Sequence, residues 1–234
     1  MMNYFLAGYF LIKPKAIIFG DYIGKLVHTC SGCINDSLLE TWCYSWTYPD
    51  IDIDEIKQKF RITDDRIAEL RIWVDKKFHE NKIGWAEVFL DRDTVFAYKT
   101  KFFSHLPELK ILAIYLNEID LAILINKFEP QQPNMGDFGI VKMLKKKILE
   151  KEAINEEMLG YDFIGLEPGG SFHTFYCYNV TEQLVNKLGL SVNEFGLLEQ
   201  ADNWDQIHLY LNDKTKGLEP VHWVVARTKR IHGG

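Results

Sequence analysis

Runs of apolar residues along the chain predict its β-strands. Tyr4–Ile12 is an apolar run near the N-terminal end, and Leu109–Leu116 is nearly all apolar, which is typical of strands buried on both faces. Tyr161–Leu166 and Ser171–Tyr178 are expected to form two more strands, because the Glu-Pro-Gly-Gly segment between them is typical of a hairpin turn. Val221–Ile231 is expected to be the last strand.

Apolar residues three and four positions apart predict helices between these strands. Thr63, Asp91 and Asn117 each precede such a stripe and have the short polar side chains that cap helix N-termini. The sequence therefore predicts an α+β fold, a mixed β-sheet with packed helices, with a helix-rich first half and a β-rich C-terminal third. We expect a single domain over residues 1–234, with a subdivision near 129–137 as the alternative, because that segment contains two prolines and a glycine.

Composition and charge narrow the class of partner. The 234 residues carry a net charge of −6, so the overall field disfavours phosphate backbones and no nucleic-acid partner is expected. The apolar run Tyr4–Ile12 is shorter than the ~20 residues that span a bilayer, and lysines follow it instead of preceding it. We therefore expect a cytoplasmic protein with no membrane partner, whose acidic surface suits a basic protein partner.

The strongest local motif combines one histidine with cysteines. His28, Cys30 and Cys33 have the spacing His-x-Cys-x-x-Cys, and Cys43 follows in the same region. These four side chains have the chemistry of a zinc site, but structural zinc sites usually pair two short-spaced motifs and the second is missing here. We therefore expect no cofactor, with zinc as the alternative. Buried reduced thiols are the favoured interpretation, and a redox Cys-x-x-Cys pair is the third.

His173 and Cys177 are of the types that form a base and a nucleophile, but their spacing argues against a direct pair. On the expected strand they share a face and lie about 13 Å apart, at ~3.3 Å per residue. A thiolate–imidazole pair needs a separation of about 3 Å. Each side chain is therefore expected to pair only with a residue from another element, and a half-buried strand with a hydrogen-bonded histidine is the simplest interpretation.

Five short motifs occur together along most of the chain. They are Thr41-Trp42-x3-Trp46, Gly160-Tyr161-Asp162-Phe163-Ile164-Gly165, Phe172-His173-x-Phe175-x-Cys177-x-Asn179, Asn193-Glu194-x-Gly196-Leu197 and Glu219-Pro220-Val221-x-Trp223. The combination resembles a family of uncharacterised bacterial proteins. Some members of that family look like immunity-type proteins of toxin systems, which bind and neutralise a partner toxin. The resemblance implies no catalytic residues.

The sequence contains none of the common dinucleotide-binding, phosphate-binding, metalloprotease or serine-hydrolase motifs. We therefore expect a non-catalytic protein-binding module, an immunity-type protein whose partner is a basic toxin. Trp42, Trp46 and Trp223, together with His173, are the expected partner contacts, because tryptophans dominate binding hot spots. The alternative is a small zinc- or thiol-dependent enzyme that uses the Cys30–Cys33 pair or His173.

Overall fold

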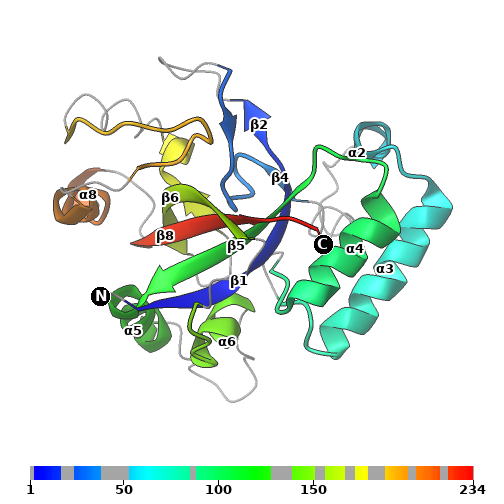
Figure 1. Cartoon of the computed structure of the whole chain (residues 1–234), viewed down its shortest axis with the longest axis horizontal. Coiled ribbons are helices and arrows are strands. Elements are labelled where there is room, and N and C mark those ends of the chain that lie inside the picture. The colour runs from blue at the N-terminus through cyan, green and yellow to red at the C-terminus, as the bar shows by residue number, and fades with distance from the viewer. Residues whose placement is uncertain are drawn as a thin grey trace.

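The computed structural model shows an α+β fold, as predicted, in which helices surround one large sheet (Figure 1). The structure describes residues 3–16, 24–37, 53–84, 88–127, 139–150, 156–166, 172–178, 188–199, 204–216 and 221–233. Its strands are β1 (Tyr4–Lys13), β2 (Lys15–Ala16), β3 (Leu26–Val27), β4 (Asp36–Ser37), β5 (Lys110–Asn117), β6 (Glu156–Leu166), β7 (Phe172–Thr174) and β8 (His222–Ile231). Its helices are α2 (Ile53–Phe60), α3 (Asp64–His79), α4 (Arg92–Phe103), α5 (Glu118–Lys127), α6 (Gly139–Lys145) and α8 (Trp204–Leu211), with 3-10 helices η2 (Phe175–Tyr178) and η3 (Lys214–Lys216).

The main sheet has six strands in the order β4-β1-β5-β8-β6-β7. The predicted strands Tyr4–Ile12, Leu109–Leu116 and Val221–Ile231 are confirmed and lie side by side as β1, β5 and β8. Each described strand pair is antiparallel, so the expected mixed sheet is wrong in that respect. A buried apolar run is the same for either strand direction, which is why the sequence could not distinguish them. The sheet combines strands from before and after residues 129–137, which lie outside the described residues.

Two glycines lie where the central strands change register. The shift in β1 falls between Leu6 and Gly8, and the shift in β6 falls between Met158 and Gly160. The φ angles of Gly8 and Gly160 are +154° and +147°, which residues with a side chain rarely adopt. A Cβ atom at Gly8 would lie 2.1 Å from Val88 Cγ2. Glycine at this position therefore lets the chain around Val88 pack directly on β1.

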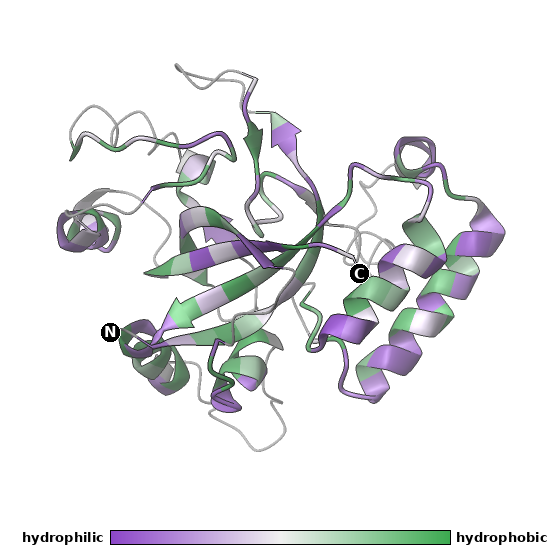
Figure 2. Cartoon of the chain, in the orientation of Figure 1, coloured by the Kyte–Doolittle hydropathy of each residue, from purple (hydrophilic) through white to green (hydrophobic). Residues whose placement is uncertain are grey.

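The helices lie around the sheet, with α6 below β1 in the view of Figure 1. Helices α2, α3 and α4 lie on the side of the C-terminus, and α5 and α8 lie on the side of the N-terminus. The predicted caps are confirmed, because the side chains of Thr63, Asp91 and Asn117 each accept a backbone N–H of the following helix. Many residues of the central strands are hydrophobic, and many residues of the helices are hydrophilic (Figure 2). Among the described residues, no helix is long and apolar enough to cross a membrane.

Buried residues form two hydrophobic cores. The larger core lies around β1 and β5 and includes residues from α3, α4, α5 and α6. The smaller core includes Phe163 and Trp223 from the sheet, Phe175 from η2 and Ile207 from α8. Since Trp223 is 0% exposed, its side chain cannot contact a partner at the surface of this fold. The prediction that Trp223 is a partner contact is therefore wrong.

Candidate functional site

A hydrogen-bonded loop after β3 presents Cys33 at the surface. Asn35 Nδ2 donates to the backbone oxygens of Val27 at 3.0 Å and Thr29 at 2.8 Å, and Ser31 Oγ accepts from Cys33 N at 3.3 Å. Asn35 and Ser31 are buried, whereas Cys33 is exposed. The loop therefore holds one exposed thiol above two buried polar side chains, which hydrogen bonds keep in place.

His28 and Cys30 do not form a common site with Cys33 in the described part of the chain. His28 is buried, its Nδ1 lies 3.1 Å from Leu26 O, and its ring packs edge-on against Phe195 with centroids 5.4 Å apart. Cys30 is 4% exposed and belongs to the larger core, as expected for a buried thiol. Cys43, the fourth member of the predicted zinc group, lies outside the described residues.

The chain after β7 turns back on itself instead of continuing as a strand. Strand β7 ends at Thr174, η2 follows, and Thr174 N donates to Cys177 Sγ at 3.4 Å. The predicted strand Ser171–Tyr178 is confirmed for Phe172–Thr174, which pairs with β6, and is wrong for Phe175–Tyr178. The separation of about 13 Å, which full strand extension implies, is therefore wrong as well. The reason is that the neighbours Phe175 and Tyr176 are both buried with ring centroids 4.4 Å apart, whereas a strand would direct them to opposite faces.

Cys33, His173 and Cys177 form a group that we call the thiol cluster. Their ligand atoms, Sγ or ring nitrogen, all lie within 4.8 Å of one another. Cys33 Sγ is 3.4 Å from His173 Nδ1, and Ser31 Oγ is 3.8 Å from Cys177 Sγ. His173 thus pairs with a residue of another element, while its closeness to Cys177 depends on η2, which the sequence did not predict.

The two cysteines of the thiol cluster differ in pKa. The hydrogen bond from the Cys177 thiol, helped by Ser31 and His173, outweighs burial and lowers the pKa of Cys33 to about 5. The same hydrogen bond, together with burial, raises the pKa of Cys177. The lowered pKa favours the thiolate at Cys33, and the thiolate is the nucleophilic form of cysteine.

A buried carboxyl group joins the two segments that contribute the thiols. Asp162 on β6 is 1% exposed and accepts hydrogen bonds from Thr29 Oγ1, in the Cys33 loop, and from Thr174 Oγ1 at 2.8 Å, beside η2. Burial raises the pKa of Asp162 to about 7, despite the hydrogen bonds from Thr29 and Thr174. Asp162 therefore fixes the position of the Cys33 loop relative to His173 and Cys177 without touching either sulfur.

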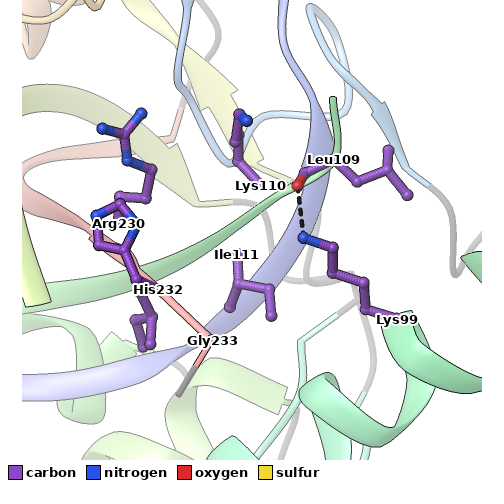
Figure 3. Close-up of a pocket in the computed structure, with 8 residues that line it drawn as sticks. Lys99, Leu109, Lys110, Ile111, Arg230, His232 and Gly233 are labelled. Atoms are coloured by element: carbon purple, nitrogen blue, oxygen red, sulfur yellow. Dashed lines mark hydrogen bonds between the residues drawn. The ribbon is translucent and has the colours of Figure 1, made fainter. Parts of the chain in front are cut away.

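A basic pocket lies at the C-terminal end of β8 (Figure 3). It has a volume of about 330 Å³ and is lined by Lys99, Leu109, Lys110, Ile111, Arg230, Ile231, His232 and Gly233. Burial and the neighbouring charge of Lys110 lower the pKa of Lys99, whose Nζ donates to a backbone oxygen at 2.9 Å. Arg230 and His232 both contact Glu157, at 2.9 Å and 2.7 Å. The pocket can attract an anion, but its lining offers no thiol or hydroxyl nucleophile.

The predicted partner contacts are only partly placed by the structure. Trp42 and Trp46 lie outside the described residues, so their role stays a prediction. Trp223 is buried, as described above. His173 is half-buried and belongs to the thiol cluster. The described residues therefore do not identify the surface that a partner would contact.

Comparisons with known proteins add no family assignment. Neither the protein-family models nor the curated proteins nor the solved structures include a match to this chain. The thiol cluster is therefore interpreted from its own geometry and chemistry.

Proposed function

We propose that the protein performs reversible thiol–disulfide chemistry, with Cys33 as the attacking thiolate and Cys177 as the resolving thiol. The observation that supports this is the double contact of Cys33 Sγ, which accepts a hydrogen bond from Cys177 and lies 3.4 Å from His173 Nδ1. Cysteines that react in redox sites are accessible, have a low pKa and often lie beside a resolving cysteine. Cys33 meets all three conditions.

The reaction proceeds in two exchanges. The Cys33 thiolate attacks one sulfur of a substrate disulfide, forms a mixed disulfide and displaces the other substrate sulfur as a thiolate. Cys177 then attacks Cys33 Sγ, which closes the Cys33–Cys177 disulfide and releases the second substrate sulfur. The proton of Cys177 passes to the departing sulfur, and two electrons pass from the protein to the substrate. His173, when protonated, stabilises the Cys33 thiolate through the contact at 3.4 Å.

Trapping of the mixed disulfide tests this assignment. In oxidised glutathione, the Cys177→Ser chain is expected to accumulate glutathione on Cys33, because no resolving thiol is present to release it. The wild-type chain is expected to accumulate little of this adduct. Cys30→Ser is the matched control and should behave as wild type, since Cys30 is buried in the larger core. Equal adduct levels in wild type and Cys177→Ser would contradict the role of Cys177.

A zinc site at the same residues is the second candidate. Cys33, His173 and Cys177 offer three ligand atoms within 4.8 Å of one another, and zinc sites with three protein ligands and an open position are of the catalytic type. A bound ion would protect both thiols, so alkylation of Cys33 would require a chelator. Fast alkylation of Cys33 in protein purified without chelator favours the thiol–disulfide function over this one.

A further inference from the structure

A second group of ligand-type side chains lies away from the cysteines, where α5, α8 and β8 meet. Asp120 is in the first turn of α5, His208 is in α8, and His222 begins β8. Their ligand atoms all lie within 4.8 Å of one another. The two imidazole rings meet edge to face, with centroids 5.6 Å apart and planes at 87°. One carboxylate and two imidazoles from three separate elements therefore converge on one point.

The carboxylate of this group is positioned from one side only. Asp120 Oδ2 accepts hydrogen bonds from Asn117 Nδ2 at 2.7 Å and from Val225 N at 3.3 Å. Within the described part of the chain, no donor reaches Oδ1. Hydrogen bonds that hold one oxygen and leave the other available are the outer contacts that orient a metal-binding carboxylate.

The histidines are also held in place. Asn212, just after α8, accepts from Trp223 N at 3.1 Å through Oδ1 and donates from Nδ2 to His208 O at 2.9 Å. This side chain therefore fixes the turn of α8 that bears His208 against the strand that begins with His222. His208 Nε2 is buried and has no hydrogen-bond partner among the described residues, although buried ring nitrogens are normally paired.

We propose that Asp120, His208 and His222 bind a divalent transition-metal ion such as zinc. Imidazole nitrogens and a carboxylate are ligands of zinc, iron and nickel, and two histidines with one carboxylate leave open coordination positions for water or a substrate. The ion offsets the cost of burying Asp120, which is 5% exposed and whose carboxylate lies within 4.8 Å of ring nitrogens of His208 and His222. His208 and His222 are partly exposed as residues, and the Nε2 atom of each is buried.

Metal binding in the absence of the thiol cluster tests the proposal. A Cys33→Ser/Cys177→Ser chain is stripped with chelator and titrated with Co(II), then with competing Zn(II). We expect one Co(II) per chain, with visible absorption but without an intense thiolate charge-transfer band, because all ligands are nitrogen and oxygen. In that background, Asp120→Asn and His208→Asn are expected to weaken binding by more than the ~10–100-fold typical of losing an outer contact. His79→Ala removes an exposed histidine of α3 and should leave the affinity unchanged.

Three results decide the outcome. Saturable binding that Asp120→Asn and His208→Asn both weaken by more than ~100-fold supports the site. Absence of binding tighter than about 10 µM in the chain without the two thiols overturns it. Equal affinity in Asp120→Asn, His208→Asn and their parent also overturns it. If a substituted chain lacks the parent's circular dichroism, histidine NMR of the parent decides instead: the rings of His208 and His222 must shift on addition of Zn(II), and unshifted rings overturn the proposal.

Discussion

The ionisation of Cys33 gives the most quantitative prediction of the account. Its pKa of about 5 lies well below the ordinary value of 9.0. At pH 7 Cys33 is then about 99% thiolate and an ordinary cysteine about 1%, a ratio of about 100. A thiolate of low pKa is also a weaker nucleophile, and with a Brønsted coefficient of ~0.4–0.5 a difference of four pKa units costs about 40–100-fold. The two effects nearly cancel at pH 7, so the rate at that pH is not diagnostic.

The pH profile of the rate separates the two cases. Between pH 6 and pH 8 the reaction of Cys33 with dithiodipyridine is expected to change by only about 10%, because the thiolate is already formed. An ordinary thiol becomes roughly 100-fold faster over the same interval, and at pH 6 it should be about 10–20-fold slower than Cys33. Stopped-flow absorbance of the released thiopyridone gives the rates, and mass spectrometry of peptides identifies the labelled cysteine.

Variants test the causes of the shift. Replacing His173 by Asn removes both its charge and its contact with Cys33 Sγ, so the pKa of Cys33 should rise and the rate at pH 6 should fall. Cys33→Ser should abolish the pH-independent phase altogether. A Cys33 rate that climbs about tenfold per pH unit through pH 8, as for an ordinary thiol, would refute the reasoning.

Three further outcomes concern stability, measured by urea unfolding. Asp162 has a pKa of about 7 in the folded protein, against an ordinary value of 3.8. Its contribution to the free energy of unfolding is therefore fully present below pH 4 and is lost as the pH rises to 7. Asp162→Asn should remove this pH dependence, and an unchanged pH profile of the variant would contradict the reasoning. Trp204→Ala should cost about 3 kcal/mol, the low end for a tryptophan, because its partly exposed ring packs on Tyr161 at 4.6 Å; a loss below ~1 kcal/mol would show that this packing contributes little. Gly8→Ala should cost more than Gly189→Ala, since both have positive φ but only Gly8 lacks room for a Cβ, and equal losses would refute the steric argument.

The strands and helices with a simple pattern of apolar residues were predictable, because that pattern reflects which residues are buried. The N-terminal strand is confirmed by β1, in which nine residues are buried in a row. The cap at Thr63 is confirmed by its hydrogen bond to Arg66 N, since capping is a local interaction encoded within four residues. Strand direction was not predictable, because it depends on the path of the chain between strands.

The thiol cluster was predictable only in its parts. The sequence identified Cys33 and His173 as reactive types, but joined Cys33 to its near neighbours His28 and Cys30. The actual partners lie about 140 positions away along the chain, and they meet Cys33 through β6 and the turn of η2. One local signal was available, since Phe175 and Tyr176 are adjacent aromatic residues that alternation would not bury together. Asp162, which is buried inside an apolar strand, is the residue whose role the sequence did not suggest.

The metal site proposed at Asp120 shows the same limitation. Asn117 was predicted as a helix cap, and the structure confirms it, but the cap also orients Asp120 towards two histidines from distant segments. His208 lies in α8 next to the buried Ile207. No spacing in the sequence joins these three residues, because each lies on a different element.

Disulfide mapping after equilibration in glutathione tests the central claim most directly. The wild-type chain is held in buffers of increasing oxidised glutathione, quenched by alkylation and digested, and its disulfides are assigned by mass spectrometry. The account predicts one intramolecular disulfide between Cys33 and Cys177, formed with the loss of two hydrogens and fully reversed by reduced glutathione. A chain in which Cys33 and Cys177 stay separately alkylated at every ratio, or in which Cys33 pairs with Cys30 instead, would contradict it.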